Sequence, residues 1–454
     1  MGTEPAVVAR SLPFRRRRPT PVTDALRRLD ATVSPLVGIV KDVVQLTYGA
    51  DDCRLSTVTC RVAPTGRTLG QETVDRGGSW HLGPERARAG ALGEAVERYC
   101  GAFVPEELLV AGSAGELGDR VVDPDEFSLF HPRQHAKPGF PFEPFTASSR
   151  LRFVEGFSLR DGSPALLPAQ LVFLRGQLAG EPTIGYSTSN GLACGPTLEE
   201  AILAALLEVV ERDSIMLAWN AGLSLPLLDW SGDADLRRLE RLYFAPAGIE
   251  YSVVDASSFH DVPVAVAVLH GPPWGAAELS VGAAAAATPQ AAWLKALAEA
   301  FGVRRWRRDL GVLDPQFEVA EADEITSFDD HTFYYATPER ARQARFLHAS
   351  AERRAVSDVR PLGDTTALEQ IEEIVQRLAA RGVDAYAVDV TSPDVRSLGM
   401  WVARVVAPAL YGLDVAHVAR YLGGNRLYRL PFELGLRASP LRFEDVNPLP
   451  HPFP

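Results

Sequence analysis

Two hydrophobic periods alternate along the chain, one typical of strands and the other typical of helices. Runs of β-branched residues predict strands, and apolar residues at every third or fourth position predict helices. Strands are expected at 37–44, 56–62, 169–174, 249–255, 262–269, 383–390 and 400–406, and helices at 78–101, 197–218, 288–309 and 368–381. Because the two kinds of element alternate without a strict βαβ repeat, the sequence predicts an α+β fold with mixed sheets.

The predicted helices begin with residues that favour helix starts. Thr197 and Thr288 are placed to cap the second and third helices, because a threonine oxygen accepts a hydrogen bond from the first turn. Pro84 lies near the expected start of the first helix, and Gly101 follows its expected end. The run Ala283–Ala287 is too short to indicate a disordered, low-complexity tract.

The composition is that of a globular protein, with 454 residues of which 46% are hydrophobic and 23% are charged. The net charge of −12 argues against a protein that binds the nucleic-acid backbone, since such a protein needs a basic surface. No apolar run approaches the roughly 20 residues that a membrane span needs. No apolar segment follows Arg15–Arg18, as it would in a secretory signal, so we expect a cytoplasmic protein.

One charged pattern occurs twice on the predicted helices. The segment Glu94–Arg98 places two glutamates and an arginine on one helical face, because residues three and four apart are neighbours on a helix. The segment Glu208–Arg212 repeats this E-x-x-E-R pattern on the second helix. Taken alone, the pattern is typical of ion pairs on an exposed helix.

The residues upstream of both patterns favour a buried or ligand-facing surface instead. Small residues precede Glu94 and Glu208 at offsets of three, four and seven, where an exposed helix normally carries long polar side chains. The helix around Glu208 is also apolar on most of its surface. Buried carboxylates must be compensated, and Arg212 can neutralise only one of the two on its helix. A bound cation is the natural remaining partner, and hard oxygen ligands select Mg²⁺ or Ca²⁺.

Two such helices packed face to face would offer four carboxylates and two arginines. That set suits Mg²⁺ ions that bridge a polyphosphate, with arginine on the phosphate oxygens. The chain has no G-x-x-x-x-G-K-[ST] motif, so the site would not be a P-loop nucleotide site. The residues alone leave two hypotheses open, a metal–nucleotide site and a structural ion-pair network between two helices.

Four segments resemble motifs of one known family. The segment Gly185–Asp213 resembles the signature of the YcaO superfamily, and Ala91–Tyr99 resembles its other glutamate helix. Ala296–Arg304 resembles a third motif, and the proline-rich end Asn447–Pro454 resembles the terminus of the azoline-forming members. The resemblance implies a YcaO-like fold, in which mixed sheets and helices surround a site for ATP and Mg²⁺.

The resemblance further implies an ATP-dependent cyclodehydratase that modifies a ribosomally made precursor peptide. In such enzymes a Cys, Ser or Thr side chain attacks the preceding backbone carbonyl, and ATP phosphorylates the resulting oxyanion. Loss of phosphate then leaves a thiazoline or an oxazoline. Relatives use the same ATP chemistry to make a thioamide or a macrocyclic amidine, and the proline-rich end favours azoline formation over these alternatives.

Individual residues also receive roles from the resemblance. Arg212 is expected to contact phosphate, and Arg304 is a second candidate for a nucleotide contact. The terminal carboxylate of Pro454 is expected near the active site, where it would help proton transfer. Five glutamates are expected to bind Mg²⁺ around ATP: Glu94, Glu97, Glu200, Glu208 and Glu211.

Three positions depart from the family pattern. The family usually has Ser at the place of Gly90, Asn at the place of Pro196 and Gln at the place of Gly302. These departures motivate an alternative function, a catalytically weak scaffold that binds the precursor peptide or a partner enzyme. ATP consumption that depends on peptide would distinguish the enzyme from the scaffold.

Four alternating prolines end the chain, at positions 448, 450, 452 and 454. They predict an extended, polyproline-like tail of low conformational entropy, which can enter a pocket at little entropic cost. From the residues alone, a disordered end or a ligand for an SH3-type domain would explain the pattern as well. The family resemblance favours the pocket.

One large catalytic domain is expected at residues 66–454, and residues 1–65 are expected to form an N-terminal arm and a docking region for a partner. This first segment is too short for a leader-peptide-binding module of about 80–90 residues. A separate protein is therefore expected to bind the leader of the precursor peptide. The sequence leaves open whether the chain forms a homodimer.

Overall fold

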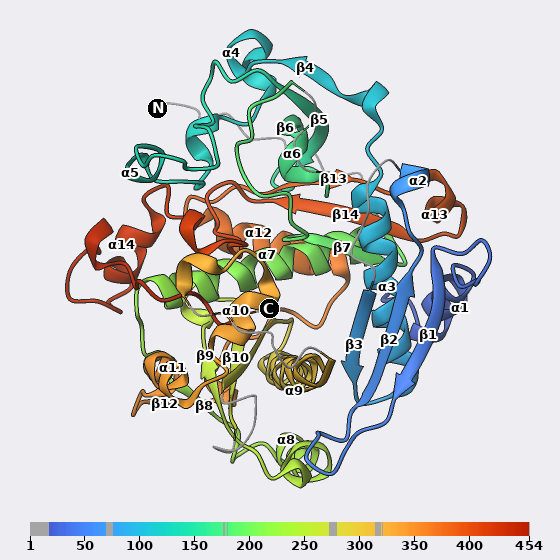
Figure 1. Ribbon diagram of the computed structural model, residues 1–454, viewed down its shortest axis with the longest axis vertical. Helices are drawn as coiled ribbons and strands as arrows, with labels where there is room; N and C mark the ends of the chain where they lie inside the picture. Colours follow the sequence, from blue (N-terminus) through green and yellow to red (C-terminus); the bar gives the residue numbers. More distant parts are fainter. Residues whose placement is uncertain are drawn as a thin grey trace, which may run out of the picture.

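The computed structural model describes residues 18–69, 76–175, 178, 180–271, 279–313, 319 and 321–453. Within these residues the strands form three separate sheets, and three long helices lie between and beside them (Figure 1). This combination of helices with mixed sheets confirms the predicted α+β class. The long helices are α3 (Pro84–Ala102), α7 (Leu198–Asn220) and α9 (Pro289–Leu313).

The first sheet lies beside α3 and is antiparallel, with the strand order β1–β2–β3. Its strands are β1 (Val40–Leu46), β2 (Ser56–Val62) and β3 (Arg76–His81). Helix α3 packs against β2 and β3, and α1 (Val22–Asp30) packs against α3. Because β2 pairs with β3, the boundary expected at residue 65 falls inside this sheet.

The second sheet packs against α9 and has the strand order β11–β10–β9–β8–β12. Neighbouring strands are antiparallel except for the parallel pair β8 and β12. The strands are β8 (Leu227–Asp229), β9 (Glu250–Asp255), β10 (Val264–His270), β11 (Leu279–Ala285) and β12 (Arg353–Ala355).

The backbone of α9 lies unusually close to β11. A Cβ atom added at Gly282 would lie 2.3 Å from the amide nitrogen of Ala300 and 2.5 Å from the carbonyl oxygen of Ala296. The run Ala283–Ala287 continues this strand with small side chains. Small residues are therefore required here because a helix backbone rests directly on the strand.

The third sheet lies on the other side of the central helix α7. The strand order is β4–β5–β13–β14–β7, with β6 paired to β5, and all the pairs are antiparallel. Its strands are β4 (Val110–Gly112), β5 (Leu151–Ser158), β6 (Pro164–Pro168), β7 (Leu192–Gly195), β13 (Tyr386–Asp389) and β14 (Trp401–Val406).

Helix α7 connects the second and third sheets. It contacts β7 and β14 on one side and β11 on another, and α12 (Ala367–Ala379) packs against it as well. Met216 and Trp219 are almost completely buried in the largest apolar cluster of the described residues. The apolar surface predicted for this helix is therefore explained by its central position between two sheets.

The remaining helices are short and mostly join strands or cover sheet ends. Among the described residues, no helix is both long and apolar enough to span a bilayer. These helices are α2 (Gly66–Leu69), α4 (Ala114–Leu117), α5 (Pro132–His135), α6 (Ala169–Val172), α8 (Ala234–Leu239), α10 (Phe328–Tyr334), α11 (Pro338–Gln343), α13 (Pro393–Ser397) and α14 (Arg426–Glu433).

The capping residues predicted for the long helices are confirmed. The Thr197 hydroxyl oxygen accepts a hydrogen bond of 3.2 Å from the amide of Glu200, and Thr288 accepts one of 3.2 Å from Ala291. Pro84 occupies the first turn of α3, as expected. Gly101 lies inside the last turn of α3 rather than beyond its end.

Two predicted elements are wrong. Residues 78–81 were expected in the first helix but belong to strand β3, because they pair with β2 and the helix begins only at Pro84. Residues 169–174 were expected to form a strand, but Ala169–Val172 forms the helical turn α6 directly after β6 ends. At residues 78–81 the pairing with β2 overrides the local propensity of the sequence.

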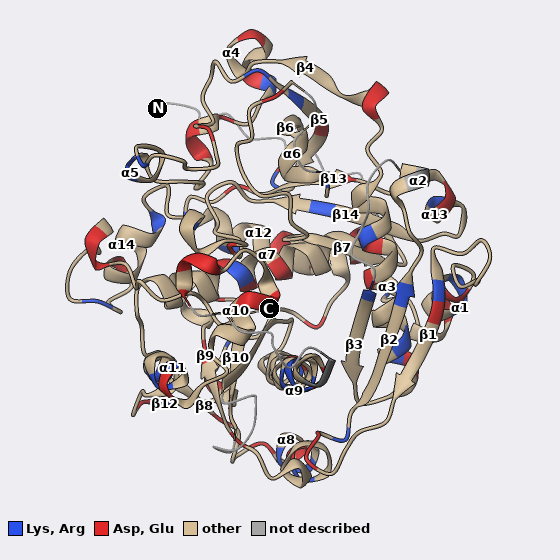
Figure 2. Ribbon diagram, viewed as in Figure 1, with Lys and Arg blue, Asp and Glu red and all other residues tan. Residues whose placement is uncertain are grey.

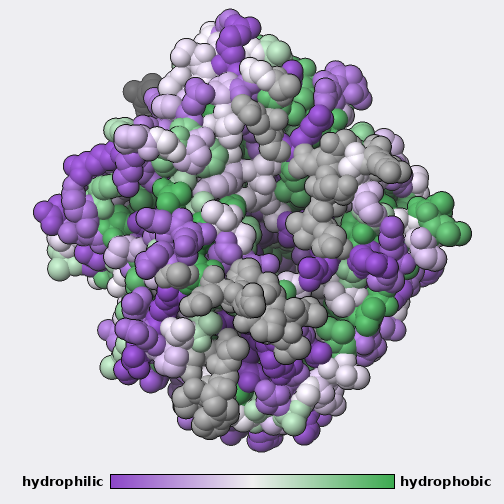
Figure 3. All heavy atoms as spheres, viewed as in Figure 1, coloured by the Kyte–Doolittle hydropathy of each residue, from purple (hydrophilic) through white to green (hydrophobic). Residues whose placement is uncertain are grey.

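Exposed apolar side chains gather near the N-terminal sheet. Leu36 and Val37 are each 91% exposed in the loop before β1, which protrudes as a hydrophobic tip at the right-hand edge of the surface (Figure 3). Val44 and Tyr48, on and just after β1, are also exposed. Four of the eight exposed large hydrophobic residues of the described chain therefore lie between residues 36 and 48.

We predict that Gly282→Ala destabilises the protein by about 2 kcal/mol, because its methyl group would push α9 away from β11. Gly232→Ala is the matched control, since a Cβ atom there meets open space. Denaturant unfolding of both variants measures the difference. Equal unfolding free energies for the two variants would contradict the close helix–strand packing.

Candidate functional site

A cleft opens where the three long helices approach one another. Its volume is about 420 Å³, and helices α3, α7 and α9 each place charged side chains in it. Acidic and basic residues mark α3 and α7 in this central region (Figure 2). The lining residues are Gly78, Ser79, Trp80, Glu94, Ala204, Leu207, Glu208, Glu211, Arg212, Ala283, Ala284, Ala285, Lys295, Ala298 and Glu299.

Three glutamates of the cleft are held by backbone amides of nearby strands. Glu94 accepts a hydrogen bond of 2.8 Å from the amide of Gly78 in β3. On the opposite side, the amide of Ala285 in β11 donates to Glu211 at 2.9 Å. The amide of Ala283 donates to Glu299 at 3.0 Å. One carboxylate from each long helix is thus oriented by the edge of a sheet.

Each E-x-x-E-R pattern forms its own cluster of ion pairs. Arg98 lies 3.5 Å from a carboxylate oxygen of Glu94 and 3.8 Å from one of Glu97. The corresponding pattern on α7 has Arg212 at 3.1 Å from Glu211 and at 3.7 Å from Glu208. Most of these distances exceed a good hydrogen bond, so each arginine is shared between two carboxylates.

Burial of these carboxylates shifts their protonation. Burial raises the pKa of Glu211 to about 8, and it also raises the pKa of Glu97, Glu208 and Glu299. Neighbouring carboxylates add to the pKa shifts of Glu97, Glu211 and Glu299, whereas arginines oppose the shifts of all four glutamates. The cluster therefore lacks positive charge, and a divalent cation would supply it.

Magnesium fits this donor set when a polyphosphate accompanies it. Among the described residues, no three acidic, cysteine or histidine side chains converge closely enough to hold a metal by themselves. Mg²⁺ usually takes one or two protein carboxylates and completes its shell with water and substrate phosphates. Carboxylates spread around a cleft, with Arg212 and Lys295 beside them, match that mode of binding.

Two residues expected at the nucleotide have other partners in the structure. Both carboxylate oxygens of Glu200 are engaged by Thr20 at 2.7 and 3.0 Å, and Thr197 lies at 3.1 Å. Arg304 donates to Asp51 at 3.0 and 3.1 Å. Neither side chain lines the cleft, so the structure does not bring these two residues to Glu94, Glu208 and Glu211. The expected Pro454 lies outside the described residues.

Two charged cleft residues, Glu299 and Lys295, were missed by sequence reasoning. Both lie on α9, within the third motif or just before it. A signal for Glu299 was present, because Ala296 and Ala292 precede it at offsets of three and seven. Small residues precede Glu208 at the same offsets. No comparable signal existed for Lys295, whose pKa is lowered by burial in the cleft.

The family match covers most of the site. Residues 81–411 match the family model of the YcaO cyclodehydratases, which are described as ATP- and Mg²⁺-binding. The chain belongs to the YcaO family. The match includes all three helices that supply carboxylates to the cleft. This YcaO protein therefore binds ATP and Mg²⁺, and the carboxylate cluster is the part of the described chain that suits them.

Similar proteins share the same fold. An uncharacterized protein of Methanothermobacter thermautotrophicus is 26% identical over 345 residues, covering 74% of this chain and 82% of that protein. A solved heterocyclase in complex with substrate and cofactor has a TM-score of 0.80 at 23% identity, covering 97% of this chain and 59% of that chain. The heterocyclase TruD has a TM-score of 0.69 at 24% identity, and the match covers 97% of this chain and 55% of that chain. The chain thus spans little more than half the length of these two heterocyclases.

The proline-rich tail of this YcaO chain is buried from Pro450 to Phe453. It has neither helix nor strand, in agreement with the predicted extended tail. Tyr335 donates a hydrogen bond of 2.5 Å to the carbonyl oxygen of Pro450, and Trp219 of α7 donates one of 3.0 Å to that of Leu449. The described tail is therefore anchored to the protein rather than free.

A pair of buried histidines completes the anchor. The rings of His331 and His451 stack with centroids 3.7 Å apart, and the Nδ1 atom of His331 donates to the carbonyl oxygen of His451 at 3.0 Å. Burial lowers the pKa of His331 to about 4. Burial lowers the pKa of His451 as well, and the positive charge of Arg212 adds to this effect. The two buried histidines therefore fix the described end of the tail inside the protein.

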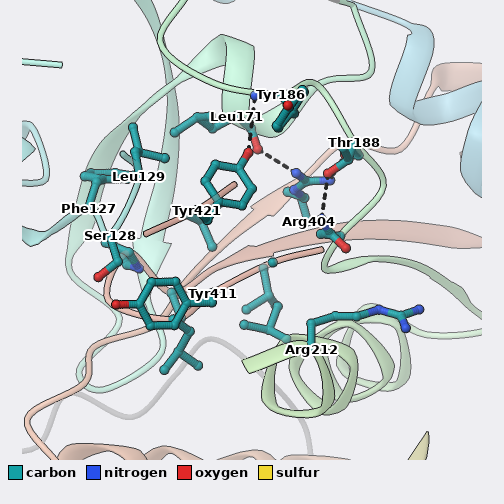
Figure 4. A pocket seen from close by; sticks show the side chains of 18 residues that line it. Phe127, Ser128, Leu129, Leu171, Tyr186, Thr188, Arg212, Arg404, Tyr411 and Tyr421 are labelled. Atoms are coloured by element: carbon teal, nitrogen blue, oxygen red, sulfur yellow. Dashed lines mark hydrogen bonds between the residues drawn. The ribbon is translucent and has the colours of Figure 1, made fainter. Parts of the chain in front are cut away.

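A second, smaller cavity of about 100 Å³ also has Arg212 in its wall (Figure 4). Arg404 of β14 lies on its far side and donates to the carbonyl oxygens of Thr188 and Leu171 at 2.7 and 2.8 Å. Burial lowers the pKa of Arg404 to about 10, while Glu208 opposes that shift. Arg212 is thus shared between the carboxylate cleft and a pocket with a second buried cation.

We predict that Glu208→Gln weakens binding of Mg²⁺ with a non-hydrolysable ATP analogue by roughly 100-fold, because it removes a carboxylate without changing its shape. The free energy of unfolding should stay equal or rise, since burying an amide costs less than burying a charge. Titration calorimetry and denaturant unfolding measure the two quantities. Glu155→Gln, at an exposed position of β5, is the control. A loss of stability without a loss of binding would favour a purely structural ion-pair network.

We predict that His331 disfavours the folded state as the pH falls from 7 to 5, whereas Glu211, whose pKa is raised, favours it over the same range. The pKa of His331 is lowered in the folded state, so the unfolded chain takes up the proton first and becomes favoured below its own pKa near 6.5. The contribution of His331 amounts to about 2 kcal/mol between pH 7 and 5. Denaturant unfolding at both pH values should show that lowering the pH favours the folded state of His331→Asn by about 2 kcal/mol more than that of the wild type. An equal change in both proteins would contradict the buried anchor.

Proposed function

We propose that this chain activates backbone amides of a ribosomally made precursor peptide and forms thiazolines or oxazolines from Cys, Ser or Thr. One observation carries the proposal: carboxylates from three helices meet in one cleft beside Arg212, with too little positive charge around them. Such a cleft suits Mg²⁺ and a polyphosphate. The membership in the YcaO cyclodehydratases supports this choice of reaction.

Bound Mg²⁺·ATP supplies a phosphoryl group, which turns the oxygen of an amide from a poor leaving group into a good one. The protein contributes position and charge. Glu94, Glu97, Glu208, Glu211 and Glu299 would hold the metal ions, three of them already oriented by strand amides. Charge stabilisation by preoriented groups in a partly closed site is the main contribution that a protein can make to phosphoryl transfer.

The basic residues have the complementary task of binding phosphate. Arg212 and Lys295 line the same cleft as the carboxylates, and an arginine can bind two phosphate oxygens at once. We keep Glu200 and Arg304 as members of the proposed nucleotide site by resemblance. Glu200 would have to exchange its bonds to Thr20 for the ligand, and Arg304 its bonds to Asp51.

The peptide side of the site is proposed to lie beyond Arg212. The small cavity between Arg212 and Arg404 has room for a side chain of the size of Cys, Ser or Thr. The described tail is anchored to α7, the helix of Arg212, by the hydrogen bond from Trp219 to Leu449. The carboxylate of Pro454 is the proposed proton acceptor, and the proline-rich tail favours azolines over thioamides or amidines.

Mass spectrometry tests the proposed function directly. The full chain, a leader-binding partner, the precursor peptide, ATP and Mg²⁺ should yield peptide that loses one water for each ring formed. The Glu208→Gln variant should yield unmodified peptide. Phosphate release without water loss would favour a different YcaO product, and absence of peptide-dependent ATP consumption would favour the scaffold function.

We propose that the leader-binding partner is a separate protein that docks on the exposed apolar residues between positions 36 and 48. These residues lie on or next to the sheet that packs against α3, the helix that supplies Glu94 to the cleft. Apolar side chains gathered on one exposed loop and strand are typical of a protein-binding surface. A partner at this position would hold the leader close to the catalytic cleft.

The double variant Leu36→Ser, Val37→Ser should weaken partner binding at least about tenfold, since two exposed apolar side chains are lost from the contact. Unfolding should not change, because both side chains are almost fully exposed. Biolayer interferometry with the purified partner measures the affinity. Leu242→Ser, another exposed apolar position, is the control. Equal affinities for the two variants would place the partner elsewhere.

A further inference from the structure

Strand β3 lies between two of the long helices and presents neighbouring residues to each of them. Helix α3 packs against β3, and α9 contacts it as well. Ser79 and Trp80 are consecutive residues of β3, paired with Val58 and Thr57 of β2. Consecutive side chains of a strand point to opposite faces. Ser79 therefore meets α3, and Trp80 meets α9.

Each of these two side chains rests on a glycine of the helix that it meets. A Cβ atom at Gly90 of α3 would lie only 2.3 Å from the hydroxyl oxygen of Ser79. A Cβ atom at Gly302 of α9 would lie 2.4 Å from the indole ring of Trp80, with two more ring atoms at 2.6 Å. Real Cβ atoms do not approach other atoms this closely. The two glycines therefore make the room that Ser79 and Trp80 occupy.

Both side chains reach the carboxylate cleft. The preceding residue, Gly78, donates its amide to Glu94, so this stretch of strand is fixed beside a proposed metal ligand. Trp80 also lines a neighbouring, more apolar cavity of about 440 Å³ and separates it from the cleft. The wall of the cleft on this side is thus built from β3 rather than from helix side chains.

Each side chain also brings a hydrogen-bond donor without a partner. Among the described residues, the indole nitrogen of Trp80 is buried and has no hydrogen bond, whereas the Ser79 hydroxyl belongs to a half-buried residue and makes no hydrogen bond within the protein. A buried donor without a partner, such as the Trp80 nitrogen, is costly and calls for an explanation, while the half-buried Ser79 hydroxyl is free to bind a ligand in the cleft. Next to Lys295 and Arg212, a bound phosphate chain is the acceptor with the right charge.

We propose that Ser79 and Trp80 contact the bound nucleotide, the hydroxyl as a donor to its phosphate chain and the indole as the wall beside it. The inference rests on the proposed function, since it needs a nucleotide in the cleft. It also changes the meaning of two departures from the family pattern. Gly90 and Gly302 admit side chains from β3, so the groups absent from the helices are replaced from the strand.

Binding of Mg²⁺ with AMPPCP, a non-hydrolysable ATP analogue, tests the role of Ser79 by titration calorimetry. Ser79→Ala should weaken binding about tenfold, the loss of one hydrogen bond to a charged acceptor. Its unfolding free energy should equal that of the wild type. Ser148→Ala, an exposed position, is the matched control and should bind as the wild type does.

Moving the hydroxyl from the strand to the helix is the stricter test. Gly90→Ser alone should weaken binding, since its side chain collides with Ser79. The double variant Ser79→Gly, Gly90→Ser should recover binding to within about threefold of the wild type. Gly83→Ser, at an open position at the start of α3, controls for the added serine. A double variant as weak as the sum of both single variants would contradict the shared space.

Tryptophan fluorescence tests Trp80. Adding Mg²⁺ and AMPPCP should change the emission of the wild type, and Trp80→Phe should lose most of that change. Trp230 directly follows β8 and does not line the cleft, so Trp230→Phe should keep the change of emission. Gly302→Ala should weaken binding because it displaces the indole, whereas Gly311→Ala on the same helix should not.

The possible results separate this inference from the function on which it rests. If the wild type binds no Mg²⁺·AMPPCP, the proposed function and the inference both fall. If the wild type binds and Ser79→Ala stays within about twofold of it, the contact by Ser79 falls and the proposed function stands. An unchanged emission spectrum in a wild type that binds would remove the contact by Trp80 alone.

Discussion

The central constraint on this structure is the burial of carboxylates from three helices in one cleft without enough positive charge to balance them. Each of the three helices carries one glutamate that accepts a hydrogen bond from the amide of a neighbouring strand. Those bonds fix the helices to the first and second sheets and orient the carboxylates together. Burial raises the pKa of Glu211 to about 8, and the neighbouring Glu299 and Glu208 add to this effect. The excess of buried negative charge destabilises the free protein and favours binding of a cation.

Close backbone packing is the second requirement. Gly282 allows α9 to rest on β11, and Gly90 and Gly302 allow β3 to enter between α3 and α9. A larger side chain at any of these positions would separate elements that carry cleft residues. Small residues therefore have two tasks in this YcaO chain, one in bringing backbones together and one in making room for the side chains of β3.

The sequence predicts the local parts of this arrangement better than the distant ones. The α7 and α9 helices, their threonine caps and the paired E-x-x-E-R patterns follow from spacing and capping alone. Strand β3 was missed because it is defined by its pairing with β2, which the local residue pattern does not reveal. The partner of Arg304 was unpredictable for the same reason, since Asp51 is 253 positions away. Glu299 was within reach, as small residues precede it just as they precede Glu208.

The strand amides that hold the glutamates have a consequence for how the chain acquires its binding ability. Gly78, Ala283 and Ala285 come from two different sheets, and the glutamates that they hold come from three helices spread over more than 200 residues. An incompletely folded chain with one sheet out of place would have carboxylates pointing in several directions. The cleft is therefore complete only when both sheets and all three helices are docked. A ligand that binds only this completed cleft stabilises the whole fold by mass action. It therefore raises the stability of the entire domain rather than of one part.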